Sequence, residues 1–484
     1  MSTQATAEAG AFIHGAAHQN GGAPLPVTNP ADGQVFTEVA SATAADVDAA
    51  VQSAASAFGE WAALAVSKRG ELLAKAAAHV HEHVDELVPL LTREQGKTLR
   101  DSRIELKRAV ETLEHYAGLS KALRGGFAPH LDPGTDGLVL RRPLGVVGAI
   151  VPWNFPTTLL CNKLGPALVA GNTVVAKPAD TTPLTTLRFV ELLAEAGLPP
   201  GVVNVITGSG PEAGEALVTH PGVRKIAFTG STKTGERIMA LASQGTKRLT
   251  LELGGSDPLI ICEDADLGRA ASAASMGRFY NCGQACLAVK RVYVVESVAD
   301  EVIEAVTAKA KKLRLGPGDA EGSQIGPLHT ARQRDLVADQ VSRTLEQGGE
   351  LLCGGAPPED AELASGFYYS PTVVLEPPHA SPMGVEEVFG PALPIWRVRD
   401  LDEAIELSNA SPYGLGSSVW TGDLERARAA AERLECGYTW INSPTKVYDE
   451  LPFGGIKSSG FGKEHGEEAF DYYTDSKSVV VRNG

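Results

Sequence analysis

Five short apolar runs between residues 144 and 255 constrain the fold of this chain more than any other feature. The runs are LGVVGAIVPWNFP (144–156), NTVVAKP (172–178), GVVNVITG (201–208), RKIAFTG (224–230) and KRLTLELGG (247–255). The segments that separate them have helical spacing, at 158–170, 183–196, 211–219 and 231–243. Strands buried on both faces of a parallel sheet have such near-continuous Val and Ile runs. The pattern predicts an open, doubly wound α/β sheet.

A second α/β domain is predicted after residue 255. Strand-like runs resume there in RVYVV (291–295) and PIWRV (394–398), and 298–312 has helical spacing. The chain of 484 residues also exceeds one ordinary hydrophobic core.

The segments around the first predicted sheet differ from it in sequence pattern. Residues 44–123 are mostly helical in periodicity, and GGFAPHLDPGTDG (125–137) breaks that pattern with Gly and Pro. The tail KSVVVRN (477–483) predicts a terminal strand that joins another sheet, in this subunit or in a neighbouring one.

Charge and cysteine content exclude several classes of function. A formal net charge of −16 argues against general binding to nucleic acid, which needs a cationic face. No run of about 18 apolar residues occurs, so no membrane partner is expected. The N-terminus lacks the pattern of a secretory signal, and the six cysteines are scattered rather than arranged as a disulfide framework. We therefore expect a cytoplasmic protein.

Two cysteines, Cys282 and Cys286, stand four apart in FYNCGQACLA (279–288). No His lies near them to complete a zinc site, and HVHEH (79–83) lacks the HExxH spacing and is expected to be a solvated helix face, so no metal is expected. Gly283 suggests a turn before Cys286, and a thiol near a helix N-terminus can have a lowered pKa. From the residues alone, a nucleophile and a buried inert thiol both remain open.

Two glycine-containing turns could hold a phosphate group. GSGPEAG (208–214) is one residue too long for the dinucleotide fingerprint. FTGSTKTG (228–235) places Gly230 and Ser231 at a predicted helix N-terminus, where an anion is favoured, although simple capping explains it equally well.

Three polar residues occupy unusual places in the predicted sheet. Lys177 and Asp180 follow a strand at its carboxyl end, where open α/β sheets bind ligands. Glu252 lies between Leu251 and Leu253, and burial there would raise its pKa toward that of a general base. A solvent-facing strand Glu and an exposed loop Lys are the alternatives.

Taken as an ordered set, these motifs resemble the NAD(P)-dependent aldehyde dehydrogenase superfamily. The set spans residues 145–465 and consists of PWNFP, KPAD, FTGSTKTG, LELGG, FYNCGQACLA, EEVFGP and LPFGGIKSSGFG. The resemblance implies two Rossmann-like doubly wound domains and a small β oligomerisation element. It assigns 1–124 and 144–254 to NAD binding, 255–456 to catalysis, and 125–143 with 457–484 to oligomerisation as a homodimer or homotetramer.

The resemblance also implies roles for matched residues. Cys286 is expected to be the nucleophile, Glu252 the general base and Asn154 the oxyanion-hole amide, with Lys177 on the ribose. Cys282 is expected to be a bystander that could form oxidative adducts with Cys286. The cofactor-binding set is expected to include Val151, Pro152, Trp153, Asn154, Lys177, Asp180, Gly230, Ser231, Leu253, Glu387 and Phe389.

Departures from the family pattern bear on cofactor and substrate. Asp180 stands where many NAD-using members have Glu, which favours NAD over NADP. Asn162 and Tyr280 occupy the positions of the arginines that bind succinate semialdehyde, which favours an uncharged aliphatic or aromatic aldehyde.

Three alternatives remain. GGSDP (254–258) also occurs in semialdehyde and lactaldehyde branches, and Asp449 and Glu450 could favour an aminoaldehyde. CoA-acylating relatives usually lack the base at the position of Glu252, and non-catalytic relatives tend to lose the nucleophile, so both are less favoured here.

Overall fold

The five apolar runs form five neighbouring parallel strands in the computed structural model, which describes residues 10–482. In sheet order they are β9 (Val203–Ile206), β8 (Thr173–Lys177), β7 (Val146–Ile150), β10 (Val223–Thr229) and β11 (Arg248–Glu252). The first strand in sequence, β7, lies in the middle, so the strand order reverses beside it. This is the doubly wound topology that the sequence predicts.

Short antiparallel strands extend this sheet at both edges. The additions are β1 (Gly10–Ile13) and β2 (Ala16–Gln19) beside β9, and β21 (Gly460–Phe461) beside β11. A separate hairpin is formed by β3 (Pro24–Asn29) and β4 (Gln34–Ala40). The sequence analysis predicted none of these strands, because an edge strand owes its position to long-range partners more than to its local sequence.

Helices cover both faces of the first sheet, and alternate strand residues face each layer. Val147 and Ala149 pack into a core with α3 (Val66–Glu82), α4 (Val84–Gln95), α5 (Leu99–Leu119), α6 (Pro156–Ala170) and α7 (Leu184–Glu195). Val146 and Ile150 pack into the opposite core with α2 (Ala44–Ala63), α8 (Glu215–Thr219) and α9 (Thr232–Ala242). The helical region predicted at 44–123 is therefore four helices, α2 to α5.

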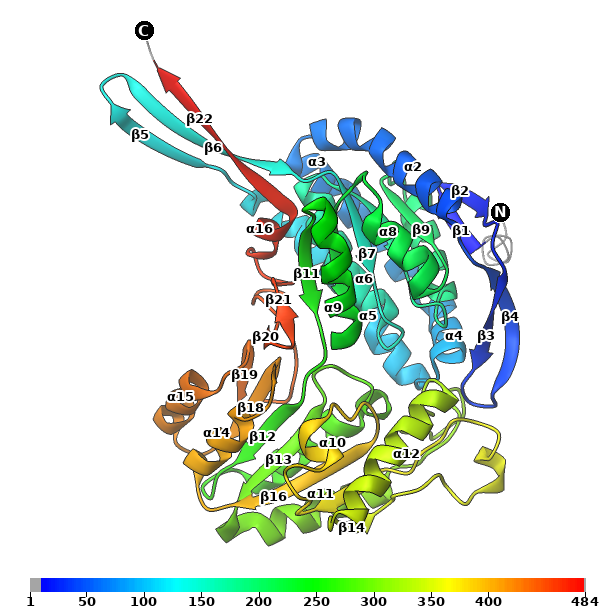
Figure 1. Cartoon of the computed structure of the whole chain (residues 1–484), viewed down its shortest axis with the longest axis vertical. Coiled ribbons are helices and arrows are strands. Elements are labelled where there is room, and N and C mark those ends of the chain that lie inside the picture. Colours follow the sequence, from blue (N-terminus) through cyan, green and yellow to red (C-terminus); the bar gives the residue numbers. More distant parts are fainter. Residues whose placement is uncertain (1–9, 483–484) are drawn as a thin grey trace.

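The second domain is also an α/β sheet, as predicted (Figure 1). In sheet order its strands are β14 (Glu350–Cys353), β15 (Thr372–Leu375), β16 (Ala392–Val398), β13 (Val289–Val295), β12 (Asp257–Ile261), β18 (Gly416–Trp420) and β19 (Tyr438–Ile441). Only β14 pairs antiparallel in this sheet. The predicted strands 291–295 and 394–398 lie within β13 and β16.

Two helical layers cover the second sheet. One contains α10 (Leu267–Phe279), α11 (Ala299–Lys312) and α12 (Ala331–Glu346), and the other contains α14 (Leu401–Asn409) and α15 (Leu424–Arg433). The remaining short elements are α13 (Pro382–Val385), α16 (Ala469–Tyr473), β17 (Tyr413–Gly414) and β20 (Ile456–Lys457).

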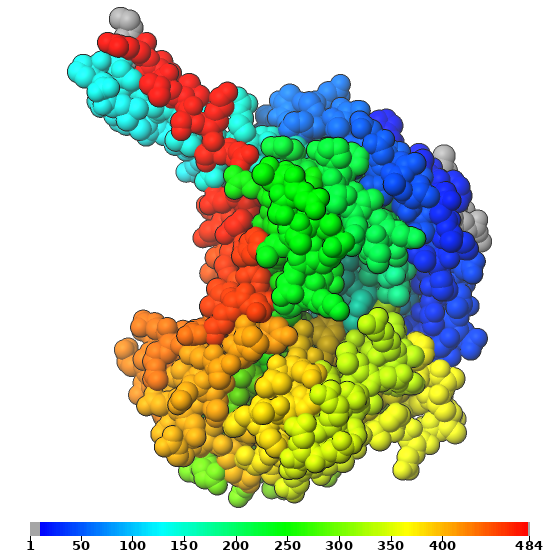
Figure 2. All heavy atoms as spheres, viewed as in Figure 1, coloured from blue at the N-terminus to red at the C-terminus, as the bar shows by residue number. Residues whose placement is uncertain are grey.

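A three-stranded arm projects from the body of the molecule (Figures 1 and 2). It consists of β5 (Gly126–Asp132), β6 (Thr135–Pro143) and β22 (Thr474–Arg482). The pairing runs from Thr474↔Pro143 to Arg482↔Thr135, so the tail joins a sheet of its own chain. The Gly- and Pro-containing segment at 125–137 therefore does end the helices, but it forms strand β5 and a turn. Residue 483 of the predicted tail strand lies outside the described residues.

Candidate active site

The carboxyl ends of the central strands bring the predicted cofactor residues to one edge of the first sheet. Lys177 ends β8 in register with Ile150 of β7, and Thr229 ends β10 in register with Glu252 of β11. Backbone hydrogen bonds join the loops beyond these strands, from Val151 N to the Lys177 carbonyl at 3.1 Å and from Gly230 N to the Glu252 carbonyl at 3.0 Å. Pro152 and Trp153 follow directly along the chain.

Lys177 is nearly buried, and its ammonium donates only to the Pro178 carbonyl, at 3.0 Å, among the described residues. Burial lowers its pKa to about 8, and the nearby Asp180 carboxylate opposes that shift. Two N–H groups therefore remain for a bound hydroxyl. The loop GSGPEAG also reaches this edge, because a Cβ on Gly214 would lie 3.6 Å from the Lys177 side chain.

The turn at Gly230 and Ser231 opens α9 as predicted. Ser231 is the N-cap, and its side chain accepts a hydrogen bond from Thr234 N. A Cβ on Gly230 would lie 2.4 Å from the ring of Phe228, so a larger residue at this turn would require that ring to move. Ser231 therefore caps the helix, as the alternative explanation predicts. The cap still leaves the first N–H groups of the helix available to an anion.

Aromatic rings and a carboxylate lie next to the loops at this sheet edge. Trp153 stacks on His329, with ring centroids 4.6 Å apart, and meets Phe389 edge-on at 5.6 Å. Glu387 accepts a hydrogen bond from Gly255 N at 3.1 Å, directly after Leu253 and Gly254. The structure therefore brings residues of PWNFP, EEVFGP and LELGG together.

Lys290 connects this carboxylate to the predicted nucleophile. Its buried ammonium lies 3.1 Å from Glu387 Oε1 and donates to the carbonyl of Cys286 at 2.6 Å. The sequence analysis missed Lys290, because a lysine at the start of a strand carries no motif signal of its own.

Cys286 lies in the loop between α10 and β13 and not at a helix N-terminus. The turn predicted from Gly283 is present, with φ of 73°, and a Cβ there would lie 2.2 Å from the Gly390 carbonyl oxygen. Burial raises the pKa of the Cys286 thiol to about 12, and the Lys290 charge lowers it in part. The helix-dipole explanation for an activated thiol is therefore wrong, and the thiol needs a base to ionise.

Glu252 is a buried carboxylate with no hydrogen-bond partner on either oxygen among residues 10–482. Burial raises its pKa well above the usual range, the charge of Glu464 raises it further, and Lys163 opposes both. The alternative of a solvent-facing strand Glu is excluded. Such an orphaned carboxylate is suited to take a proton.

Glu464 and Lys163 form a buried ion pair beside Glu252 that the sequence analysis also missed. Lys163 Nζ lies 2.6 Å from Glu464 Oε1 and 2.6 Å from Thr229 Oγ1. Asn162 Nδ2 donates to Glu464 Oε2 at 3.1 Å. Asn162 therefore faces this ion pair, while Tyr280 is half-buried and stacks on Phe155 at 5.7 Å.

Asn154 is buried between the two domains' loops. Its Nδ2 donates to the Gln284 carbonyl at 3.0 Å, which uses one of its two N–H groups. Its own carbonyl accepts from Lys97 Nζ at 2.6 Å and from Asn281 Nδ2 at 3.1 Å.

The remaining candidates have other surroundings. Asp449 is buried 2.7 Å from Arg108 and 2.8 Å from His465, so its negative charge is already paired within the protein. Glu450 is exposed. Cys282 is buried, and burial raises the pKa of its thiol, as it does for Cys286. The HVHEH segment is less solvated than predicted, because His79 Nε2 is buried 3.6 Å from Glu195 Oε2.

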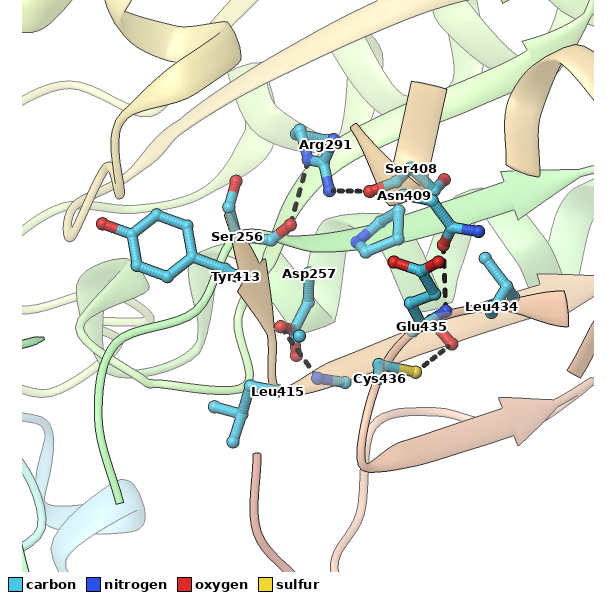
Figure 3. Close-up of a pocket in the computed structure, with 14 residues that line it drawn as sticks. Ser256, Asp257, Arg291, Ser408, Asn409, Tyr413, Leu415, Leu434, Glu435 and Cys436 are labelled. Atoms are coloured by element: carbon cyan, nitrogen blue, oxygen red, sulfur yellow. Dashed lines mark hydrogen bonds between the residues drawn. The ribbon is translucent and has the colours of Figure 1, made fainter. Parts of the chain in front are cut away.

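A separate small recess, open to solvent, lies at the start of β12 and β18 (Figure 3). Arg291 donates there to the carbonyls of Ser256 and Ser408, and Asp257 accepts from Gly416 N. Burial raises the pKa of Asp257 to about 6. None of the predicted catalytic residues lines this recess, so it is distinct from the candidate active site.

Comparisons with known proteins identify the family. The model of the aldehyde dehydrogenase family matches residues 17–479, and this chain belongs to that family. Phenylacetaldehyde dehydrogenase of Pseudomonas fluorescens is 40% identical over 466 residues, which cover 94% of this chain and 92% of the relative. The predictions of family, fold and an aldehyde-oxidising enzyme are confirmed.

Solved structures agree with this assignment. PnpE, from Pseudomonas sp. WBC-3, in complex with nicotinamide adenine dinucleotide, is 43% identical with a TM-score of 0.96, and 98% of each chain is covered. An NADP-dependent enzyme of E. coli is 35% identical with a TM-score of 0.96, and 99% of each chain is covered. In residues 10–482, no helix is both long and apolar enough to span a bilayer.

Proposed function

We propose that this enzyme oxidises an uncharged aliphatic or aromatic aldehyde to its carboxylic acid with NAD, through a thioester on Cys286. The observation that carries the proposal is the buried carboxylate of Glu252, which has no hydrogen-bond partner among residues 10–482 and whose charge raises the pKa of the Cys286 thiol. A base with a raised pKa beside a thiol with a raised pKa supports proton transfer between them.

The residues at the sheet edge fit NAD. Lys177 has N–H groups to spare for ribose hydroxyls, and Gly230 and Ser231 present the N-terminus of an eleven-residue helix to the pyrophosphate. Glu387 would accept from the second ribose, and Trp153 and Phe389, whose rings meet edge-on, would line the nicotinamide end. Val151, Pro152, Asn154 and Leu253 belong to the same loops. When bound, NAD supplies the acceptor for the hydride that leaves the substrate.

The protein's own groups perform the remaining steps. Glu252 accepts the Cys286 proton, and the sulfur forms a bond to the aldehyde carbon while the carbonyl electrons move to oxygen. The free N–H of Asn154 Nδ2 and the Cys286 backbone N–H stabilise that oxygen. After oxidation to the thioester, Glu252 releases the Cys286 proton to solvent and is again a carboxylate. It then takes a proton from water, whose oxygen bonds to the thioester carbon while the carbon–sulfur bond breaks. The sulfur leaves as the Cys286 thiolate, and the acid is released.

The preference for NAD over NADP rests on Asp180. Its half-buried carboxylate lies near Lys177, where it would repel a 2′-phosphate. The E. coli relative named above is NADP-dependent, so the two cofactors need a direct comparison. A higher kcat/KM with NADP than with NAD would refute this part of the proposal.

The substrate class is supported by the absence of an arginine at positions 162 and 280. The test is kcat/KM with NAD for hexanal, benzaldehyde, succinate semialdehyde and an aminoaldehyde. We expect a neutral aldehyde to be preferred by more than about tenfold, which corresponds to roughly 1.4 kcal/mol of transition-state discrimination. A preference for succinate semialdehyde would refute the substrate class but not the roles of Cys286 and Glu252. No turnover of any aldehyde would refute both.

We also propose that residues 1–124 with 144–254 form the NAD-binding domain, 255–456 the catalytic domain, and 125–143 with 457–484 an oligomerisation element. Within the last segment, β21 and α16 pack on the first domain, and β22 belongs to the projecting arm. The projecting arm supports the last assignment, because Phe127 and Val480 are 63% and 67% exposed on it. A homodimer or homotetramer would cover these side chains. A cytoplasmic location stays a prediction from the sequence.

A further inference from the structure

A fully buried ion pair contacts the backbone of Asn154. Lys97, in the loop between α4 and α5, and Glu105, on α5, are 2.5 Å apart, and solvent reaches neither side chain. Burying two charges costs several kcal/mol each before their attraction is counted. A pair in such a place needs further hydrogen bonds that satisfy its remaining donors and acceptors.

Those further hydrogen bonds all end on one turn of the active site. Lys97 Nζ donates to the Asn154 carbonyl at 2.6 Å and lies 4.1 Å from the centre of the Phe155 ring. Glu105 Oε1 accepts from both the N–H and the hydroxyl of Thr157, at 3.0 and 2.8 Å. The pair therefore holds both ends of the turn 154–157.

The same turn is tied to the loop that carries the nucleophile. Asn281 Nδ2 donates to the Asn154 carbonyl at 3.1 Å, beside Lys97, and Asn154 Nδ2 donates to the Gln284 carbonyl. Asn281 and Cys282 have φ of 49° and 56°, left-handed values that cost about 1 kcal/mol or more in residues other than glycine. Surrounding contacts must hold this loop in place, and the Asn154 carbonyl is one of them.

We propose that Lys97 is a positioning residue for the reaction. Lys97 and Asn281 both donate to the backbone carbonyl of Asn154, so the peptide between Asn154 and Phe155 is held in one orientation. This directs the side chain of Asn154, with the free N–H of its Nδ2, toward the oxyanion beside Cys286. The inference rests on the proposed function of Asn154. Misplacement of such a group by about 1 Å can cost up to about 100-fold in rate.

The test replaces Lys97→Met and Glu105→Gln together. The double variant removes both charges of the pair and keeps an acceptor for Thr157. It also removes the Lys97 charge, which opposes the rise in the pKa of the Asp101 carboxyl that burial causes. The readout is the rate of the NADH burst in a single turnover, which reports acylation and oxidation but not deacylation. We expect the burst to slow by about tenfold or more, with the affinity for NAD unchanged. If the double variant does not fold, Lys97→Arg, which keeps the charge, takes its place and is expected to slow the burst less.

A second background separates positioning from general damage. In Asn154→Ala, the Lys97 and Glu105 substitutions should change the burst rate by less than about twofold, because residues that act through one another are non-additive. Thr158→Ala is the matched control, since its hydroxyl bonds the Glu105 backbone without touching Asn154, and it should leave the burst unchanged. An equal slowing in both backgrounds would refute the inference alone. A normal burst in Asn154→Ala would refute the oxyanion role and the inference together.

An independent observation concerns the end of α3. His79, Glu82 and His83 each bring one ligand atom to within 4.8 Å of the others, and His79 Nδ1 lies 3.8 Å from Glu82 Oε2. His83 Nδ1 lies 2.8 Å from the His79 carbonyl, so a proton there is donated to the backbone and Nε2 keeps its lone pair. Metal-binding histidines are commonly oriented by such a bond.

We propose that His79, Glu82 and His83 bind a divalent transition metal ion such as Ni²⁺ or Zn²⁺, for which imidazole and carboxylate are suitable ligands. The probe is Ni²⁺, titrated calorimetrically into the tag-free full chain carrying Cys286→Ala, so that the nucleophile does not bind metal. We expect one saturable site whose affinity falls at least about tenfold in His79→Gln or His83→Gln. His81→Gln, on the exposed face of the same helix, is the matched control and should bind normally. Absence of saturable binding, or equal weakening in all three variants, would overturn the proposal.

Discussion

Lys163 Nζ and Glu464 Oε1 lie 2.6 Å apart in a buried ion pair beside the unpartnered carboxylate of Glu252. The two charges act on Glu252 in opposite directions, since Glu464 raises its pKa and Lys163 lowers it. The pKa of the proposed base therefore depends on burial first, which raises it, and then on this ion pair.

Replacing Glu464→Gln should lower the pKa of Glu252. The substitution removes a neighbouring negative charge and leaves the Lys163 charge unopposed, and both changes favour the ionised carboxylate. The acidic limb of the pH profile for kcat, measured where deacylation limits turnover, should then move to lower pH. Glu450→Gln, an exposed acid in the same region of sequence, should leave the profile where it is. A shift to higher pH would contradict the assignment of that limb to Glu252.

Glu252→Gln should separate the two halves of the reaction. Without this base, both the ionisation of Cys286 and the activation of water should slow, so steady-state turnover should fall by at least about 100-fold. At high pH, where the thiol ionises without Glu252, acylation should still occur and the thioester should persist. The acyl group should be detectable on Cys286 by mass spectrometry of the intact protein. Cys286→Ala should abolish both turnover and the adduct while NAD still binds. Steady-state turnover that matches the unmodified enzyme would disprove the role of Glu252.

Lys290→Met should make the nucleophile harder to ionise. Lys290 contacts the Cys286 carbonyl, and its charge opposes the rise of the thiol pKa to about 12 that burial causes. Without it the thiol pKa should rise further, so alkylation by iodoacetamide should slow at every pH below that value. The affinity for NAD should fall as well, because Glu387 loses the cation that holds it. If alkylation is unchanged and only NAD binding is weakened, Lys290 supports the cofactor-binding carboxylate Glu387 and has no role in ionising Cys286.

The sequence predicted those parts of the site that carry a local signal. The carboxyl ends of β8 and β11 identify Lys177 and Glu252, since buried strands are recognisable and a charge in one is unusual. The ordered motifs then gave Cys286, Asn154 and Glu387. The antiparallel edge strands and the arm pairing were not predictable in the same way, because short strands owe their position to long-range partners.

The residues that the sequence missed act through tertiary contact. None of the three lysines, Lys97, Lys163 and Lys290, lies in a recognisable motif. Lys97 pairs with Glu105, 8 residues away, and Lys163 with Glu464, 301 residues away. Lys290 pairs with Glu387. The expected helix N-terminus at Cys286 was wrong for a related reason. A glycine predicts a turn, but it does not determine the type of the next element, and here that element is the strand β13.

Val480→Asp should weaken self-association through the arm. The side chain is 67% exposed on β22, an edge strand of the arm, and a second copy of the chain would have to bury the new charge. Loss of one valine contact is worth about 1.5–3 kcal/mol, and a symmetric interface contains two, so Kd should rise by at least about 100-fold. Light scattering across a dilution series measures this. Val35→Asp, 54% exposed on β4 and remote from the arm, is the matched control and should not change the assembly. If both variants remain assembled at every concentration, the arm is not the interface, and the exposed valines of β22 serve some other contact.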